Sequence, residues 1–531
     1  MQNAQRSTPI DQEKTVDIAT ALRWTAERYP GRIAVGGASP LTYSEWDSRT
    51  DDLAASLLGF GARPGDRVVL MLQGGEPLAS LHLAAQKANL TSVPLSTRFG
   101  AHELAHCVGD CSPALIVTDD TTAELVATAS ASIPEAPKAI HVGDLEPRSL
   151  NGSLPDAPAE SDLSVMLYTS GTTGKPKGVP RTHRAEHTAA VAHLIQTGQP
   201  TGGVSLGVMP MFHTMGLRSL LASIVSAGTW VPQPKFNADE SMDLIFENDI
   251  DTLYLVPTIY WSLLQTGRLA EARSIRRLAY AGAAMTATLA EQLVEAVQPE
   301  RFVNHYGSTE IYTFTIGPDG ARKPGCAGRA GVFTRVRLVD PAPGAHPDQI
   351  VAPGEQGQIA VSMDSPEAFT GYWNRPDADA KSIRDGWYFP GDLATEDDEG
   401  DLWVSGRVDD MINSGGENLY PEEIERSLSR CPYMEHVVVA GTPDDKWGSA
   451  VTAFFVPADR TEPDRSLAQV QAWVRQESGL PALKRPKRFV AIDSIPTSAV
   501  GKILRRRLVD GDYKVLADTK NDQPPSARSA Q

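Results

Sequence analysis

The sequence predicts an α/β protein with a large N-terminal domain of stacked α/β sheets, a small β element and a small α+β C-terminal domain. Three patterns along the chain support this prediction. Short apolar runs alternate with helical periodicity in the first half, apolar residues follow period two after about residue 330, and both patterns mix after about residue 408. Strand–helix alternation is typical of layered folds with largely parallel sheets, and period-two alternation indicates antiparallel strands.

The first half supplies the elements of the large domain. Mainly apolar residues recur at i, i+3, i+4, i+7 and i+8 from Ile18 to Ala26, and they predict a helix that Pro30-Gly31 ends. A second helix is expected over residues 77–89. Short apolar runs predict buried strands at residues 68–72, 115–118, 165–168, 206–209, 253–256 and 278–281.

The later elements are shorter and more varied. Period-two alternation at residues 336–338, 359–361 and 402–404 predicts the small β element. Beyond it we expect helices at residues 421–428 and 467–477, with strands at residues 437–440 and 453–456. The resulting organisation is an N-terminal domain over residues 1–408, a C-terminal domain over residues 409–513 and a disordered tail over residues 514–531.

The composition describes a globular protein with an acidic surface. The 531 residues include 49 Lys and Arg against 66 Asp and Glu, a formal net charge of −17. Such a surface repels polyanions, so we expect no nucleic-acid or membrane partner, although a local basic site is compatible with it. Four cysteines are too few for a disulfide framework, and the first residues lack the layout of a signal peptide. We therefore expect a cytoplasmic protein.

A loop rich in glycine, hydroxyl and lysine side chains follows the strand expected at residues 165–168. Its sequence at residues 168–178 is YTSGTTGKPKG. Glycines let a backbone approach a phosphate, hydroxyls donate hydrogen bonds and lysines offset charge. The spacing differs from a Walker A loop, and a flexible linker rarely carries this density of specific residues. The segment therefore predicts a phosphate-binding loop.

This loop resembles the phosphate loop of the adenylate-forming superfamily, which includes acyl- and aryl-CoA ligases, adenylation domains and firefly-type luciferases. Further segments similar to the motifs of that family follow in order, at residues 304–310 (NHYGSTE), 386–392 (GWYFPGD), 406–410 (GRVDD) and 496–502 (PTSAVGK). The resemblance spans roughly residues 15–510. It implies a two-step reaction, in which a carboxylate attacks ATP to give acyl-AMP and pyrophosphate, and a thiol, normally coenzyme A, then attacks the activated carbonyl.

The resemblance also assigns the residues that would hold ATP. Asp392 would accept both ribose hydroxyls, and Arg407 would contact ribose or phosphate oxygens. Glu310 would supply an oxygen ligand to Mg²⁺, which prefers carboxylate, water and phosphate oxygens. Thr309 would contact the α-phosphate. The remaining nucleotide-binding residues are Thr169, Ser170, Gly171, Thr172, Thr173, Gly174, Lys177 and Tyr306.

Lys502 is the main catalytic candidate, because an ammonium between the carboxylate and the α-phosphate stabilises charge in the transition state. Residues 484–507 hold eight basic residues against one acid, and the resemblance places coenzyme A on Arg485 and Lys487. It places the pantetheine chain near Gly416 and Trp447. It further implies that the C-terminal domain is mobile, with a hinge at Asp409 that rotates it between the half-reactions.

The acid pocket points to an aromatic, benzoate-like acid. By position in the family it is lined by His213, Tyr254, Ala281, Gly282, His305, Gly307 and Tyr312. Flat aromatic walls beside a glycine suit a planar ring. No Asp follows Phe212, which argues against an amino acid. His213 also counts among the catalytic candidates as an aromatic-gate residue, with core filling as its alternative role.

The motifs and pocket residues of the chain are most similar to those of the 4-chlorobenzoate-type aryl-CoA ligases. His305 and Tyr312 stand where those relatives have small apolar residues, and they either hydrogen-bond a ring substituent or shorten the pocket. An enzyme that loads a separate carrier protein, or a hydroxycinnamate or medium-chain acyl-CoA ligase, stays an alternative. The expected partners are a small aromatic carboxylic acid, ATP and coenzyme A, and a homodimer is one option for the assembly.

Overall fold

The computed structural model describes residues 17–145, 153–170, 175–317, 319–342, 344–410, 412–414, 417–419, 421–444, 448–497 and 503–519. It divides into two compact units. The first unit combines Met1–Val336 with Val361–Gly386, and the second combines Arg337–Ala360 with Trp387–Gln531. The mixed α/β class, with a larger N-terminal part and a smaller C-terminal one, is confirmed. The two units divide the chain at other positions than residue 408, and the predicted domain boundary stays a prediction. The disordered tail predicted over residues 514–531 is wrong at its start, because Val515–Asp518 form a strand paired with Arg488–Ile492.

The first unit contains a six-stranded sheet whose strands are parallel except at one edge. Its order is β6-β5-β3-β4-β7-β8. The antiparallel pair is β7 with β8, and it flanks the glycine-rich loop. The strands are β3 (Arg67–Met71), β4 (Thr91–Pro94), β5 (Leu115–Thr118), β6 (Lys138–His141), β7 (Leu163–Ser170) and β8 (Pro176–Thr182).

A nine-stranded sheet forms the second layer of the first unit. Its order is β15-β14-β13-β12-β11-β9-β10-β1-β2, with parallel pairing from β13 to β1 and antiparallel strands at both edges. The strands are β1 (Ile33–Val35), β2 (Leu41–Thr42), β9 (Val204–Gly207), β10 (Thr229–Pro232), β11 (Thr252–Leu255), β12 (Arg277–Tyr280), β13 (Arg301–Tyr306), β14 (Thr315–Gly317) and β15 (Arg329–Ala330).

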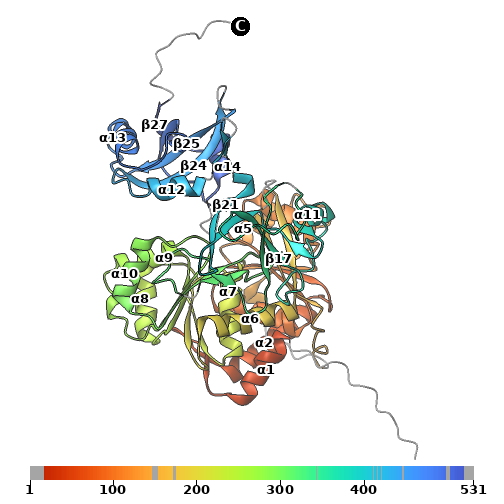
Figure 1. Ribbon diagram of the computed structural model, residues 1–531. Coiled ribbons are helices and arrows are strands. Elements are labelled where there is room, and N and C mark those ends of the chain that lie inside the picture. The colour runs from red at the N-terminus through yellow and green to blue at the C-terminus, as the bar shows by residue number, and fades with distance from the viewer. Residues whose placement is uncertain are drawn as a thin grey trace, which may run out of the picture. The chain divides into compact units, whose positions relative to one another are not determined.

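Two groups of helices cover the nine-stranded sheet. Helices α8 (Ala238–Glu247), α9 (Pro257–Gln265) and α10 (Ala287–Val297) lie together in Figure 1, and their apolar residues share one core with strands β9 and β11 to β13. Helix α6 (His183–Thr197) contacts strands of both sheets, and α7 (Thr214–Val225) packs beside it. These two helices therefore lie between the layers.

The N-terminal helices complete the second core of this unit. They are α1 (Ile18–Arg28), α2 (Tyr43–Gly59) and α3 (Glu76–Lys87), and their buried faces share a cluster with α7. Helix α2 begins with a capping box in which Thr42 and Glu45 bond each other's backbone N–H groups. Helices α4 (Ala101–Cys111) and α5 (Ala123–Ser130) pack on the outer face of the six-stranded sheet. No helix among the described residues is long and apolar enough to cross a bilayer.

The second unit begins with the predicted small β element. Its short strands are β16 (Val336–Val339), β17 (Gly357–Ser362), β19 (Trp387–Tyr388), β20 (Asp392–Glu396) and β21 (Leu402–Arg407). The pairs β17 with β20 and β20 with β21 are antiparallel, as the period-two pattern predicts. The hairpin of β22 (Ile412–Ser414) and β23 (Glu417–Leu419) follows.

A four-stranded sheet with helices forms the rest of this unit. The strands are β24 (Met434–Asp444), β25 (Gly448–Pro457), β26 (Arg488–Ile492) and β27 (Val515–Asp518), in that order across the sheet. The helices are α12 (Pro421–Leu428), α13 (Pro463–Gln476) and α14 (Arg505–Asp510). Helix α13 begins four residues before its predicted start because Pro463 occupies the first turn, where a missing N–H costs nothing.

Candidate active site

Five of the seven predicted acid-binding residues, all but His213 and Tyr312, lie where three neighbouring parallel strands end. Register pairs Tyr254 of β11 with Ala279 of β12, and Tyr280 of β12 with Asn304 of β13. Ala281-Gly282 follows β12 directly and His305 is the penultimate residue of β13. Ligands of open α/β sheets bind outside the carboxyl ends of parallel strands, so this edge is the expected place for a substrate.

The turn after β13 approaches its own return strand closely. A Cβ atom on Gly307 would lie 2.2 Å from the carbonyl oxygen of Tyr312, so only glycine fits there. The Ser308 N–H donates to the carbonyl of Ile311, and the Glu310 N–H donates to Ser308 Oγ at 3.2 Å. The turn thereby fixes the backbone of Glu310, whose side chain is buried together with that of Thr309.

Tyr372 joins two of the predicted ATP-binding residues. Its hydroxyl donates a 2.6 Å hydrogen bond to Glu310 Oε1, and the Lys177 Nζ lies 3.9 Å from the centre of its ring. Sequence reasoning missed Tyr372, which stands in the segment GYWN between the period-two runs at residues 359–361 and 402–404. The sequence signal was the glycine at position 371, and in the structure Gly371 has a φ of +113°.

The glycine-rich loop is described only at its two ends. Thr169 and Ser170 end β7 and pair across the hairpin with Lys177 and Pro176 of β8. Lys177 is thereby held opposite Thr169, and their contact with phosphate stays a prediction. The predicted loop residues Gly171, Thr172, Thr173 and Gly174 lie outside the described residues. Tyr306, another predicted nucleotide contact, packs edge-on against Phe314 at 5.3 Å between ring centres.

Arg181 is a buried cation that ties the turn after β13 to α6. Its Nη1 donates to the carbonyl oxygens of Thr309, Glu310 and Glu367 at 3.2, 3.3 and 2.9 Å. Its Nε pairs with the carboxylate of Glu186, and its guanidinium lies 3.5 Å from the centre of the Tyr312 ring. The fully buried guanidinium therefore fixes the backbone that carries Glu310.

Tyr312 has a protein partner for its hydroxyl. That group donates to Glu186 Oε2 at 3.3 Å, and burial raises the pKa of Tyr312 far above its usual value. The ring is flanked by Arg181 and, at 5.1 Å, by Arg218. A hydrogen bond from this hydroxyl to a ring substituent of a substrate is therefore the less favoured of the two roles predicted for Tyr312.

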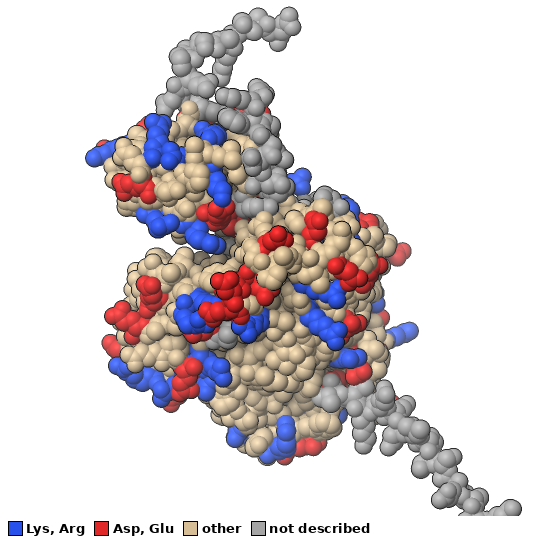
Figure 2. All heavy atoms as spheres, in the orientation of Figure 1, with Lys and Arg blue, Asp and Glu red and all other residues tan. Residues whose placement is uncertain are grey.

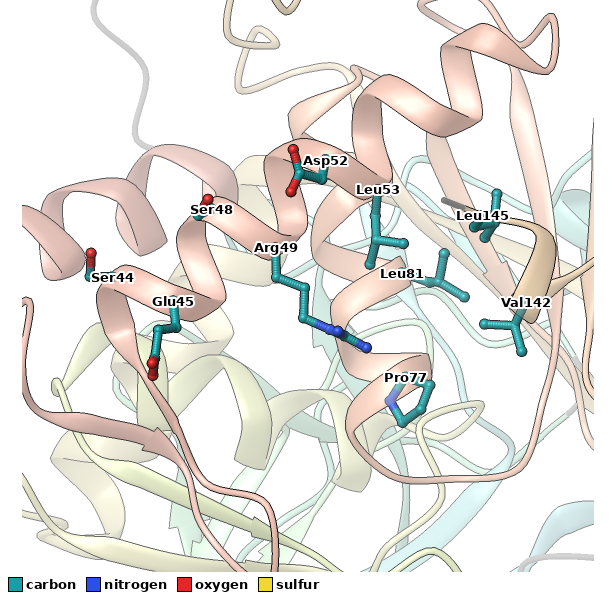
Figure 3. Close-up of a pocket in the computed structure, with 10 residues that line it drawn as sticks. All are labelled: Ser44, Glu45, Ser48, Arg49, Asp52, Leu53, Pro77, Leu81, Val142 and Leu145. Carbon is teal, nitrogen blue, oxygen red and sulfur yellow. The ribbon is translucent and has the colours of Figure 1, made fainter. Parts of the chain in front are cut away.

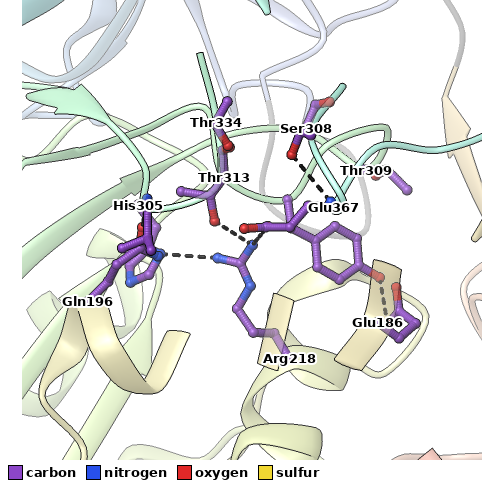
Figure 4. Close-up of polar contacts among 12 residues, drawn as sticks. Glu186, Gln196, Arg218, His305, Ser308, Thr309, Thr313, Thr334 and Glu367 are labelled. Carbon is purple, nitrogen blue, oxygen red and sulfur yellow. Dashed lines mark hydrogen bonds and ion pairs between the residues drawn. The ribbon is translucent and has the colours of Figure 1, made fainter. Parts of the chain in front are cut away.

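Arg218 is a second buried cation, on α7. Its Nη1 donates to His305 Nδ1 at 3.0 Å and its Nη2 to Thr313 Oγ1 at 2.9 Å, as Figure 4 shows. The same Nη2 lies 3.5 Å from Glu367 Oε2. Burial raises the pKa of Glu367, and the charges of Arg218 and Arg181 oppose that shift. Sequence reasoning missed Arg218, although a lone arginine inside the apolar stretch LRSLLASI was a usable signal.

His213 stands at the N-terminus of α7. It is half-buried, and its Nδ1 accepts from the Met215 backbone N–H at 3.4 Å as the helix cap. An imidazole at this position has a local structural role beside the predicted gate function, which stays a prediction. Gly216, one turn further on, admits no Cβ because the Pro210 carbonyl oxygen would lie 2.3 Å away.

The second unit holds the predicted ribose pair. Asp392 and Arg407 are register partners on β20 and β21, and Arg407 Nη1 donates to Asp392 Oδ1 at 3.0 Å. Arg407 Nη2 also donates to the carbonyl oxygen of Pro390 at 2.9 Å. Because both side chains are only partly buried, this pair presents a carboxylate and a guanidinium to solvent at one point.

The basic residues near the C-terminus are partly engaged in protein contacts. Arg485 Nε donates to the Leu480 carbonyl at 2.8 Å, and Lys487 Nζ donates to the Ala482 carbonyl at 2.8 Å. Acidic and basic side chains are interspersed on the face that Figure 2 shows. Gly416, Trp447 and Lys502 lie outside the described residues, and Asp409 is described only as part of a short 3-10 turn, Val408–Asp410.

A cavity among the described residues is lined by other side chains than these. It has a volume of about 490 Å³ and is lined by α2, α3 and the segment after β6 (Figure 3). Arg49, Asp52, Leu81 and Leu145 are among its lining residues, and none of the predicted site residues contributes to it.

Comparison with known proteins identifies the family. The family model for AMP-binding enzymes matches residues 22–373, and the model for the C-terminal domain of AMP-binding enzymes matches residues 423–502. The chain belongs to the AMP-binding enzyme family. Membership confirms the predicted adenylate-forming superfamily and supports acyl-CoA ligase activity of the AMP-forming type.

The relatives differ in the acids they are named for. A feruloyl-CoA synthase of Amycolatopsis is 34% identical over 88% of this chain and 93% of its own. A 4-chlorobenzoate–CoA ligase of Arthrobacter is 31% identical over 94% and 96%. Fatty-acid ligases are also among the relatives. The ATP-bound crystal structure of MatB from Rhodopseudomonas palustris superposes with a TM-score of 0.83 at 26% identity, covering 93% of this chain and 99% of that one.

Proposed function

We propose that this member of the family activates a benzoate-like aromatic acid and transfers it to coenzyme A. In the first step a carboxylate oxygen attacks the α-phosphorus of ATP, which forms acyl-AMP and releases pyrophosphate. In the second step the thiol sulfur of coenzyme A attacks the acyl carbon, which forms the thioester and releases AMP and a proton. The protein's task in both steps is positioning and charge stabilisation.

The observation that carries the aromatic part of the proposal is a cluster of rings at the substrate edge of the sheet. The ring centres of His193, Tyr254 and His305 lie 4.8 to 5.2 Å from one another. Gly282 follows the neighbouring strand with a φ of +82° and offers no side chain. Planar side chains beside a glycine favour a flat ring over a flexible alkyl chain.

The ATP part rests on Glu310, Tyr372 and Lys177. A carboxylate is a fitting Mg²⁺ ligand, and Tyr372 already orients one of its oxygens, so Glu310 would hold the metal that accompanies ATP. The metal would neutralise phosphate charge when bound. Lys177 and Thr169, opposite each other in the hairpin, would contact the β- and γ-phosphates. Asp392 and Arg407 would hold the ribose.

The remaining roles concern the second half-reaction. Lys502 would stabilise charge during adenylation, and rotation at Asp409 would then exchange it for the face that carries Gly416. Arg485 and Lys487 would pair with the phosphates of coenzyme A, with Trp447 beside the pantetheine chain. Each of these assignments follows the resemblance of the motifs residue by residue.

Two alternatives keep the adenylation chemistry and change a partner. A separate carrier protein would replace coenzyme A as the acceptor, or a hydroxycinnamate or medium-chain acid would replace the benzoate. A relative named as a fatty acid–[acyl-carrier-protein] ligase, 30% identical over 88% of this chain, keeps the first alternative in view. The basic segment at residues 484–488 favours coenzyme A, because that acceptor brings several phosphate charges.

Pyrophosphate release tests the proposal directly. The purified chain would be assayed with ATP and Mg²⁺ against substituted benzoates, cinnamates and fatty acids, each with and without coenzyme A. We expect benzoates to give the highest kcat/KM and coenzyme A to be consumed. A clear preference for aliphatic acids would overturn the aromatic assignment, and acyl-AMP formation without thioester would point to a carrier protein.

A further inference from the structure

Arg218 and His305 form a hydrogen-bonded pair inside the first unit. Arg218 Nη1 lies 3.0 Å from His305 Nδ1, and the two residues are 1% and 2% exposed. Arg218 lies on α7 and His305 on β13, and the two residues are 87 positions apart in the sequence. The pair lies at the substrate edge described above, since the His305 ring contacts Tyr254 of β11.

The direction of this hydrogen bond decides where the imidazole carries its proton. A guanidinium only donates, so His305 Nδ1 accepts and bears no hydrogen. Burial, together with the neighbouring His193 and Arg218, keeps the pKa of His305 well below its usual value. The ring is therefore neutral near pH 7, and its single N–H is on Nε2.

That Nε2–H has no hydrogen-bond partner among the residues that the structure describes. A buried donor without a partner has lost its hydrogen bonds to water and gained none in the protein, so it destabilises the folded chain. The rings of His193 and Tyr254 flank the imidazole, and neither supplies a hydrogen bond to this nitrogen among the described residues. This Nε2–H is thus a donor that an acceptor from outside the protein could satisfy.

The charges of the buried side chains near His305 indicate whether the acceptor on the substrate is neutral or anionic. Arg181 pairs with the carboxylate of Glu186, and Arg218 faces the carboxylate of Glu367 at 3.5 Å. Two buried cations are therefore matched by two carboxylates. No surplus positive charge is present in this group of four to stabilise a second carboxylate on the substrate, which favours a neutral acceptor.

We propose that Arg218 positions His305 as a hydrogen-bond donor to the acid, so that the protein selects aromatic acids carrying a neutral oxygen acceptor on the ring. Arg218 acts through His305 and is a positioning residue, whereas His305 sets specificity. The inference rests on the proposed function and adds the substituent that the acid must carry.

Matched acid pairs test it without changing substrate size. A methoxy group accepts a hydrogen bond and cannot donate one, and an ethyl group of similar shape does neither. We expect 3- or 4-methoxybenzoate to exceed the corresponding ethylbenzoate in kcat/KM for pyrophosphate release by about 5- to 100-fold, the range that a buried unpaired donor implies.

Variants at His305 locate the effect. His305→Leu removes the donor and should bring the methoxy-to-ethyl ratio close to one. His305→Gln should keep most of the ratio, because its amide nitrogen donates while its oxygen can accept from Arg218. His82→Leu is the matched control, since this buried histidine lies on α3, which packs on α1, α2, β3 and β4, and the change should leave the ratio unchanged.

The positioning role of Arg218 has its own test. The double variant Arg218→Met/Glu367→Gln removes the pair without leaving a buried charge alone, and it should lower the methoxy-to-ethyl ratio even where kcat for the best acid persists. Nitrogen chemical shifts of histidine should report the Nε2–H form of His305 in the native chain and a mixture of tautomers in this variant.

The outcomes separate this inference from the proposed function. If no aromatic acid releases pyrophosphate, the proposed function fails. If benzoates react but the methoxy and ethyl partners are equal, or if His305→Leu keeps the preference, only the selection by His305 is overturned. A preference for dicarboxylic acids would also overturn it.

Discussion

The hydroxyl of Tyr372 donates a 2.6 Å hydrogen bond to Glu310 Oε1, and the same ring carries Lys177 on its face at 3.9 Å. One aromatic side chain thus orients both a candidate metal ligand and a candidate phosphate ligand. Because Tyr372 and Glu310 are 62 residues apart, the contact exists only in the folded chain.

Tyr372→Phe tests this arrangement. The change deletes the hydroxyl, keeps the ring beneath Lys177 and leaves the Glu310 carboxylate free to turn. We expect kcat/KM for MgATP to fall about 5- to 30-fold, as the loss of a hydrogen bond to a charged group implies. Pyrophosphate release at several Mg²⁺ concentrations measures it. Tyr29→Phe on the surface is the control, and an unchanged response to Mg²⁺ would refute the role.

Lys502→Ala separates the two half-reactions. Removing an ammonium that stabilises transition-state charge should lower the rate of adenylation by about 100- to 1,000-fold. Thioester formation from preformed acyl-AMP should change little, because the α-phosphate bond is already made. Single-turnover assays of each half-reaction give both numbers. Equal losses in the two would remove Lys502 from this role.

Asp409→Pro tests the proposed hinge. Proline fixes φ near −65° and removes the backbone N–H, so it should hinder rotation about this residue. We expect thioester formation to slow more than adenylation, by about tenfold or more, if domain rotation separates the steps. Asp409→Ala, which leaves φ free, is the matched comparison. Comparable effects of both substitutions would argue against a hinge at this position.

Glu422 should make the stability of the chain depend on pH. Its side chain shares Arg505 with Glu425 and Asp410, and burial raises its pKa to about 7. Between about pH 4.5 and pH 7 the folded state holds this proton while the unfolded state has released it. Stability should therefore fall across that window as pH rises, by about 1–3 kcal/mol in total.

Glu422→Gln removes the titrating group and should flatten this dependence. Urea unfolding of the full chain at pH 5 and pH 8 measures the difference for both proteins. Glu423→Gln is the control, because that neighbouring side chain is exposed and pairs with Lys484. A native chain that is as stable at pH 8 as at pH 5 would contradict the prediction.

The sequence predicted the elements well where one periodicity was uninterrupted. The helix expected from Ile18 is α1, and the strand expected at residues 115–118 is β5. Strand β24 is longer than the predicted residues 437–440, because exposed polar residues such as His436 interrupt the apolar run at its start. A strand that is solvated on part of one face gives a weak pattern at those positions.

The buried polar network could not be predicted from sequence. Arg181 and the Thr309 carbonyl it binds are 128 residues apart, and a single arginine is usually solvated. His305 and Tyr312 were identified as pocket residues from motif position, but their partners Arg218 and Glu186 come from other elements. Only the fold brings these charges together, so local spacing does not show which of them pair.

The contacts that hold Tyr312 also determine which positions are open to redesign. The ring of Tyr312 lies between Arg181 and Arg218, and its hydroxyl donates to Glu186. Arg181 also donates to the backbone carbonyl of Glu310. A mutation at Tyr312 meant to enlarge the proposed acid pocket would therefore also disturb the backbone of Glu310. Libraries that seek new acids should vary the end of β12 and leave this aromatic residue untouched.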